Sequence, residues 1–157
     1  LLMDEKQKLK AVYGMIRERQ LVNYYKKALA KAGNTPQHLA EMLECRLDNM
    51  VYRLKFASTI FAAQQLVSHG HILVDGKKVD RRSFEVRPGM VISVREKSQK
   101  VKPIVDSLEN TNRAVPEYLS FDAAKFSGQL LVKPQIDQIS WPVEINLPAI
   151  CDFLNHT

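Results

Sequence analysis

The stretch LVSHGHILVDGKKV, residues 66–79, contains the signals that decide the fold. Gly70 can adopt the positive φ that ends a helix, and the β-forming residues 72–74 predict a strand directly after it. Asp75-Gly76 is the preferred pair for a two-residue type I′ turn. The stretch therefore predicts helix, stop, strand and hairpin, with a polar cluster near its ends made of His69, His71, Lys77 and Lys78.

Helical periodicity precedes this hairpin. Residues 4–31 predict a helix with Gly14 as its weak point, because apolar residues recur at helical spacing at Leu9, Val12, Tyr13 and Ile16. Thr35 is expected to cap the next helix, with Pro36 at its first position. A further helix is expected over about 46–56, and Ser58 is expected to cap the helix after it, which buries Ala62, Ala63, Leu66 and Val67.

After the hairpin the pattern changes to short segments. Arg87-Pro88-Gly89 predicts a turn into a strand over 91–94. Pro142 and Pro148 argue against a long C-terminal helix. Three other short elements are expected, a helix at 104–112 and strands at 118–121 and 129–133.

Composition restricts the class of protein. The chain has 157 residues, of which 45% are hydrophobic, so one or two domains can bury a core. No apolar run is long enough to cross a bilayer, and no signal-peptide pattern opens the chain. The chain begins at Leu1 rather than Met, so we expect a natural N-terminus beyond it. Cys45 and Cys151 are expected to be ordinary buried thiols, with a disulfide as the alternative.

The charge is distributed unevenly. The net charge is +6, with the basic excess in residues 1–100 and an acidic excess in residues 101–157. Such an excess in one segment suggests a polyanionic partner, and a solvated basic surface is the alternative.

Two patterns in the sequence resemble reactive sites. Arg46-Leu47-Asp48 matches the triplet that carries the catalytic aspartate of pseudouridine synthases, but Cys45 stands where these enzymes usually have His. A carboxylate that holds a neighbouring arginine on an ordinary helix is the favoured interpretation. His69-x-His71 offers two metal ligands, and no third ligand follows at a metal-site spacing. We therefore expect no catalysis, no metal and no cofactor.

Binding to RNA is the hypothesis that remains. Ser58-Thr59 places hydroxyls and free N–H groups at a helix start, which favours phosphate. An RNA duplex is recognised mainly by its shape and backbone, which suits basic side chains around that point. The candidate RNA-binding residues are Lys6, Lys8, Lys10, Arg17, Arg19, Arg46, Arg53, Lys55, Ser58, Thr59, Gln65, His69, His71, Lys77 and Lys78.

Two stretches carry a family resemblance, RLDNMVYRLKFAST (46–59) and QLVSHGHILVDGKKV (65–79). They resemble the small RNA-binding module named after the S-four family of small-subunit ribosomal proteins. Three flanking stretches resemble the rest of that family: EKQKLKAVYGMIRERQ (5–20), VPEYLSFD (115–122) and VEINLPAICDFL (143–154).

The resemblance implies an α+β fold of two domains. A helical domain would comprise 1–45 and about 142–157, and an inserted RNA-binding domain of short helices on a mainly antiparallel sheet would comprise 46–141, with its core module at about 46–96. The family normally has a basic N-terminal arm, sometimes with zinc-binding cysteines. The resemblance implies that this arm, and any zinc, lies outside this sequence.

The resemblance also implies a function. It implies a structural, non-enzymatic component of the ribosome that binds small-subunit rRNA, nucleates assembly of the subunit body and contributes to translational accuracy. The implied partners are that rRNA and neighbouring ribosomal proteins, S-five among them, with no membrane and no small-molecule substrate. The implied location is the small ribosomal subunit in the cytoplasm, with an organellar matrix or stroma as the alternative. The competing classes are an rRNA pseudouridine synthase and a free RNA-binding stress factor with the same module.

One departure from the family concerns the helix after Ser58. Relatives commonly have arginines where this chain has Ile60 and Gln64, so weaker electrostatic contact with RNA is expected there. The 100° step per residue puts Ile60 on a row with Gln64 and Ser68, and Phe61 on another row with Gln65 and Ser68. Both apolar side chains are therefore expected toward solvent, beside the buried face. The alternatives are that Ile60 meets RNA or a neighbouring protein, or that it packs under the following strand.

Overall fold

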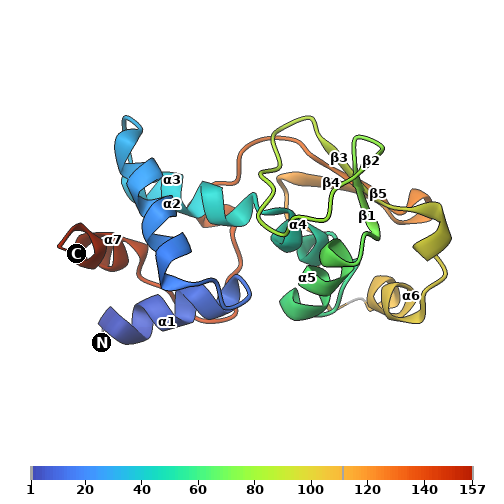
Figure 1. The fold of residues 1–157 in the computed structure, drawn as a ribbon, viewed down its shortest axis with the longest axis horizontal. Coiled ribbons are helices and arrows are strands. Elements are labelled where there is room, and N and C mark those ends of the chain that lie inside the picture. The colour runs from blue at the N-terminus through green and yellow to red at the C-terminus, as the bar shows by residue number, and fades with distance from the viewer. Residues whose placement is uncertain (1, 111, 157) are drawn as a thin grey trace. The chain divides into compact units, whose positions relative to one another are not determined.

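The computed structural model describes residues 2–110 and 112–156. The chain divides into two compact units, which we name by their contents. The helical unit comprises 1–44 and 134–157, and the mixed unit comprises 45–133. Figure 1 shows that both ends of the chain belong to the helical unit, with the mixed unit inserted between them in sequence. Among the described residues, no helix has the length and apolar character needed to cross a membrane.

The helical unit contains four α-helices and a short 3-10 turn within its described residues: α1 (Leu2–Val12), α2 (Glu18–Ala30), α3 (Thr35–Glu44), η3 (Ile136–Gln138) and α7 (Leu147–Asn155). Leu9, Tyr13, Leu21, Leu39, Leu43 and Ile150 are fully buried between them. The single helix expected over 4–31 is wrong, because Gly14 and Met15 have φ of 87° and 61°. Left-handed backbone at two successive residues ends α1 and turns the chain into α2.

Two expectations about helix ends in this unit meet different outcomes. The side chain that caps α3 is not Thr35: the Oδ1 of Asn34 accepts the N–H of Gln37 at 3.3 Å. Pro142 and Pro148 predict that no long helix forms at the C-terminus, and α7 has only 9 residues. Pro148 lies in the first turn of α7, where its missing N–H costs nothing.

The mixed unit packs short helices against one antiparallel sheet. Its helices are α4 (Leu47–Arg53), α5 (Ile60–Ser68) and α6 (Lys102–Glu109), with 3-10 turns η1 (Glu96–Ser98) and η2 (Ala123–Lys125). Its strands are β1 (Ile72–Val74), β2 (Lys77–Lys78), β3 (Val91–Val94), β4 (Leu119–Asp122) and β5 (Ser127–Leu130). The strand order is β2-β1-β3-β5-β4, and every neighbouring pair is antiparallel. The expected α+β class, with short helices on an antiparallel sheet, is therefore confirmed.

The hairpin predicted at Asp75-Gly76 forms as expected. Asp75 and Gly76 have φ of 50° and 82°, and a type I′ turn needs positive φ at both central residues. Gly70 ends α5 with φ of 79°. The register pairs Ile72 with Val94 and Val74 with Ile92, so four buried side chains face the same side of the sheet.

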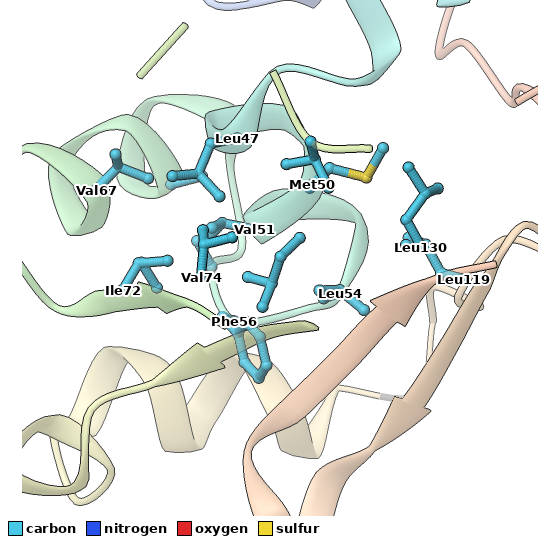
Figure 2. Packing of buried hydrophobic residues seen from close by; sticks show 14 of the residues in the cluster. Leu47, Met50, Val51, Leu54, Phe56, Val67, Ile72, Val74, Leu119 and Leu130 are labelled. Carbon is cyan, nitrogen blue, oxygen red and sulfur yellow. The ribbon is translucent and has the colours of Figure 1, made fainter. Parts of the chain in front are cut away.

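The core of the mixed unit lies between this sheet and α4 and α5. Figure 2 shows Leu47, Met50, Val51 and Leu54 of α4 and its C-terminal end directed at side chains of the strands. Gly128 on β5 lets the side chain of Leu54 pack closely against that strand. A Cβ at this position would clash with Leu54 and would lie 2.9 Å from the main-chain oxygen of Ser120. Both cysteines are buried free thiols, which confirms the expectation for Cys45 and Cys151.

Several predicted boundaries in the mixed unit need correction. α4 ends at Arg53 rather than near 56, because Lys55 adopts φ of 69°. Thr59, not Ser58, caps α5, with its Oγ1 accepting the N–H of Ala62 at 3.0 Å. The strand expected at 129–133 ends at Leu130, and the strand expected at 118–121 begins one residue later. The helix expected at 104–112 is α6, and residue 111 lies outside the described residues.

Candidate nucleic-acid interface

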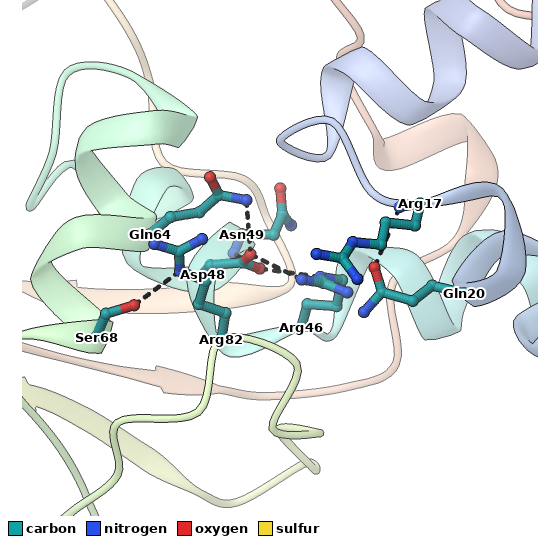
Figure 3. A network of polar contacts seen from close by, with 8 residues as sticks. All are labelled: Arg17, Gln20, Arg46, Asp48, Asn49, Gln64, Ser68 and Arg82. Carbon is teal, nitrogen blue, oxygen red and sulfur yellow. Dashed lines mark hydrogen bonds and ion pairs between the residues drawn. The ribbon is translucent and has the colours of Figure 1, made fainter.

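A carboxylate fixes the start of α4. Asp48 is fully buried, and the guanidinium of Arg46 donates to both of its oxygens, from Nε at 3.1 Å and from Nη2 at 3.0 Å. The N–H of Asn49 and the side-chain amide of Gln64 also donate to it, at 2.7 and 3.4 Å. Figure 3 shows these groups converging on Asp48. The predicted structural role of Asp48 is confirmed, and the placement of Arg46 argues against its expected contact with phosphate.

Arg82, which is not among the candidate RNA-binding residues, lies next to Asp48. The main-chain oxygen of Arg82 accepts the N–H of Asp48 at 3.2 Å, and its Nε donates to the Oγ of Ser68 at 2.7 Å (Figure 3). Arg81 and Arg82 are both exposed. Arg81-Arg82 comes three residues after β2, so its closeness in sequence to the two hairpin lysines could have identified it.

The outer side of α5 is exposed along one row. Phe61, Gln65 and Ser68 stand at helical spacing and are all exposed, with Phe61 at 55%. Ile60 is half-buried and Gln64 is buried at 7%. Phe61 is therefore exposed as expected, Ile60 is only partly exposed, and Gln64 turns inward to Asp48.

Polar groups lie at both ends of this row. Ser58 and Thr59 are exposed at the start of α5, and His69 is exposed just after its end. Lys77 and Lys78 are exposed on β2, and the stem of Lys78 passes over Gly70, where a Cβ would come within 3.2 Å of it. We call Ser58, Thr59, Phe61, Gln65, Ser68, His69 and Lys78 the α5 surface. A helix of this length spans about 13 Å, enough for two or three successive phosphates.

His71 is directed elsewhere. Its Nδ1 lies 2.6 Å from the Oγ of Ser98, to which Arg95 Nε also donates at 2.8 Å. Partial burial lowers the pKa of His71, and the nearby charges of Arg95 and His69 lower it further. This bonding argues against the expected RNA contact of His71. His69 and His71 have ring centroids 6.4 Å apart, and the described part of the chain holds no cluster of three potential metal ligands.

The lysines of α1 mostly serve the helical unit itself. Lys6 and Lys10 contact Glu18 at 2.8 and 3.0 Å, and Lys8 contacts Glu5 at 2.6 Å. Hydrogen bonds from Lys6 and Lys10 lower the pKa of Glu18. Lys6 also lies 4.6 Å from the ring centroid of Phe153. These pairings argue against phosphate contacts for the three lysines.

The exposed cations of the helical unit lie on α2 and at its two ends. Arg17 and Arg19 are exposed, as the site prediction requires of them. Lys26, Lys27 and Lys31 are exposed as well and were not among the candidates. Lys26 and Lys27 lie about two turns after Arg19 on α2, and Lys31 follows the end of that helix, so helical spacing could have identified them.

The remaining candidates are at the end of α4 and just after it. Arg53 and Lys55 are half-buried, and the guanidinium carbon of Arg53 lies 5.9 Å from the centroid of the Tyr52 ring. Taken with the α5 surface, these residues offer cations, hydroxyls and an exposed aromatic ring, which are the groups that bind an RNA backbone and its bases. The fold and these groups define a nucleic-acid-binding module of the α+β class.

Comparisons with known proteins identify the family. Residues 45–92 match the family model described as the S4 domain, and residues 1–44 match the one described as the ribosomal protein S4/S9 N-terminal domain. The small ribosomal subunit protein uS4 of Protochlamydia amoebophila is 70% identical over the whole chain, which covers 76% of that protein. Those of Chlamydia muridarum and Chlamydia pneumoniae are 60% and 55% identical over 99% of the chain and 76% of each relative.

The chain belongs to the uS4 family of small ribosomal subunit proteins. The predicted resemblance is thereby confirmed. Because this is a family of structural ribosomal proteins, the chain is not an enzyme, and the interpretation as a pseudouridine synthase is set aside.

Proposed function

We propose that this chain is a structural constituent of the small ribosomal subunit that binds its rRNA through the α5 surface and the adjoining lysines of β2. The observation that carries the proposal is the exposed row of α5, which has hydroxyls at one end and His69 and Lys78 at the other. Membership of the uS4 family supports the ribosomal setting.

The proposed RNA contacts are narrower than the sequence alone suggested. They comprise the α5 surface with Arg53, Lys55, Lys77 and Arg81 in the mixed unit, and the exposed cations of α2 with Arg17 in the helical unit. Lys6, Lys8, Lys10, Arg46 and His71 are left out because each is bonded within its own unit. We further propose that the mixed unit is an RNA-binding domain, with its core module at about 46–96, inserted into a helical domain. The expected end of this domain at about 141 differs from the end of the mixed unit at 133, because Ile136, Ile139 and Trp141 pack in the core of the helical unit.

The finer parts of the proposal concern role and neighbours. We propose that binding nucleates assembly of the subunit body, that ribosomal protein S-five is a neighbour, and that the pair contributes to translational accuracy. The relatives named above come from chlamydial bacteria, which supports the cytoplasm as the location.

Competition binding tests the proposal. The purified chain should bind a small-subunit rRNA transcript in the presence of an equal mass of large-subunit rRNA, and the Lys77→Gln variant should bind more weakly. Lys125→Gln is the matched control, because Lys125 is exposed in the same unit on η2 and away from α5. Equal binding to both RNAs would contradict the proposal.

A second measurement separates a ribosomal protein from a free RNA-binding factor. In a gradient of native cell extract, the protein should sediment with small subunits at physiological salt. A protein found only in the soluble fraction at the top of the gradient would favour the free factor.

A further inference from the structure

The loop between α4 and α5 has an unusual backbone. It runs from Leu54 to Thr59 and carries three of the proposed RNA-binding residues, Lys55, Ser58 and Thr59. Lys55 has φ of 69°, a left-handed conformation that residues with a side chain seldom adopt. Leu54, Phe56 and Ala57 are buried, so the loop is anchored on the core, and it reaches solvent at its end before α5. A backbone of this kind persists only when its surroundings hold it.

Two residues from a later part of the chain supply that support. Arg113 donates from Nη1 to the main-chain oxygen of Tyr52 at 2.8 Å and from Nη2 to that of Ala57 at 2.6 Å. Ser107, on α6, donates from Oγ to the main-chain oxygen of Lys55 at 2.7 Å. Side chains of Ser107 and Arg113 thus hydrogen-bond three carbonyls: that of the left-handed residue itself, one before it and one after it.

The geometry of Arg113 is specific to arginine. Its guanidinium carbon lies 4.0 Å from the centroid of the Tyr52 ring, so the planar group stacks on the ring while its two ends reach different carbonyls. A lysine has one ammonium group and cannot bridge the two carbonyls while lying flat on the ring. The side chain is half-buried, and this burial lowers its pKa.

We propose that Arg113 is a positioning residue for RNA binding, which with Ser107 holds the Leu54–Thr59 loop in the shape that presents Lys55 and the start of α5 to phosphate. The inference rests on the proposed function. Both supporting residues lie outside the stretch that matches the S4 domain, residues 45–92. The binding loop of that module is therefore completed by a segment beyond it.

Substitutions that separate charge from geometry test the inference. Arg113→Lys keeps the positive charge and loses the bridge, and Arg113→Gln loses both. Ser107→Ala changes no charge. Lys125→Gln is the control, because it removes an exposed cation of the same unit without touching the loop. The measurements are the Kd for a small-subunit rRNA transcript, its salt dependence, and amide hydrogen exchange, all well below the unfolding temperature.

The expected result is a similar loss for both arginine variants. Each should weaken RNA binding about tenfold, because the RNA must then order the loop itself, while the salt slope stays as in the wild type. The amides of Lys55 and Phe56, which bond to Tyr52 and Val51 at 3.0 and 3.2 Å, should exchange faster. Ser107→Ala should weaken binding about threefold with the same local change in exchange. Lys125→Gln should stay within about twofold of the wild type.

Two outcomes would overturn the inference. Wild-type affinity of Arg113→Lys beside a weak Arg113→Gln would make Arg113 a simple charge contact, and wild-type affinity and exchange in both would remove any role. If Arg113→Gln fails to fold, Arg113→Lys and Ser107→Ala still give these results. If the wild type shows no preference for the rRNA, the proposed function fails, while the exchange of Lys55 and Phe56 still shows whether Arg113 holds the loop.

Discussion

The guanidinium of Arg46 and the carboxylate of Asp48, two positions apart at the start of α4, are joined by two hydrogen bonds of 3.1 and 3.0 Å. This ion pair lies at the N-terminal end of α4, and a hydrogen bond from the side-chain amide of Gln64 to Asp48 links the pair to α5. The two helices that cover the sheet are therefore joined by one buried carboxylate as well as by apolar packing.

Removing that carboxylate should destabilise the mixed unit. Asp48→Asn keeps the shape of the side chain but takes away the charge that Arg46 faces, and breaking a buried pair costs about 3 kcal/mol. Urea unfolding followed by far-UV circular dichroism measures the loss. Trp141 fluorescence is a poorer probe, because that tryptophan belongs to the helical unit. Asp106→Asn is the control: its pair with Lys102 is exposed, and its loss should cost at most about 0.5 kcal/mol. Equal losses in both variants would contradict this role of Asp48.

Gly128 should not tolerate a side chain. The added Cβ of Gly128→Ala meets Leu54 and lies 2.9 Å from the main-chain oxygen of Ser120, so β5 or the end of α4 must shift. Overpacking of this kind costs about 1–3 kcal/mol in unfolding free energy. Ser127→Ala, on the same strand, is the control and should change stability by less than about 0.5 kcal/mol. An unchanged denaturation midpoint for Gly128→Ala would show that the sheet and α4 are not in this contact.

His71 should titrate below the ordinary imidazole value. Burial, Arg95 and His69 lower its pKa from 6.5 in the folded protein. The unfolded chain therefore takes up the proton at higher pH than the folded one. The stability that neutral His71 contributes is fully present above about pH 6.5 and is lost as the pH falls through the lowered pKa. NMR titration of the imidazole measures this, and Arg95→Gln should raise the pKa of His71 partway, since burial is the larger cause. A titration midpoint at or above 6.5 would contradict the bonding described for His71.

The same substitution at neighbouring positions tests the orientation of α5. Phe61→Arg places a charge on an exposed side chain and should change the unfolding free energy by no more than about 0.5 kcal/mol. It should also strengthen RNA binding through the added cation. Ile60→Arg, at a half-buried position, should lose clearly more stability than Phe61→Arg in the same thermal unfolding experiment. The reverse order would mean that α5 is rotated from the orientation described.

Local features of the fold could be predicted from the sequence where a backbone conformation is accessible to few residue types. The hairpin at Asp75-Gly76 and the helix stop at Gly70 follow from positive φ, which few residues tolerate, and both are present. The end of α4 was predicted too late, because a lysine gives no indication in the sequence that its backbone is left-handed, as that of Lys55 is. That conformation is imposed by Arg113 and Ser107, which come more than fifty residues later.

The sequence identified candidate RNA-binding residues by their charge, but it did not show which of them pair with carboxylates inside the protein. Lysines and arginines were identified as phosphate contacts from their charge alone. Lys6, Lys10 and Arg46 nevertheless face carboxylates in the structure. The pairs of Lys6 and Lys10 with Glu18 depend on how α1 and α2 pack, which helical spacing does not encode, whereas Arg46 pairs with the neighbouring carboxylate that was expected to hold it. The exposure of Phe61 was expected from helical spacing, whereas the inward turn of Gln64 toward Asp48 depends on a tertiary contact that spacing does not encode.

The salt dependence of rRNA binding tests the central claim most directly. Six to eight phosphate contacts predict a slope of log K against log salt of roughly −4 to −7 for the wild-type chain. The double variant Lys77→Gln, Lys78→Gln should bind more weakly at every salt concentration, with a slope about two units shallower, because each lysine contributes about one contact. A wild-type slope near zero, or a double variant with the wild-type slope and affinity, would contradict the account.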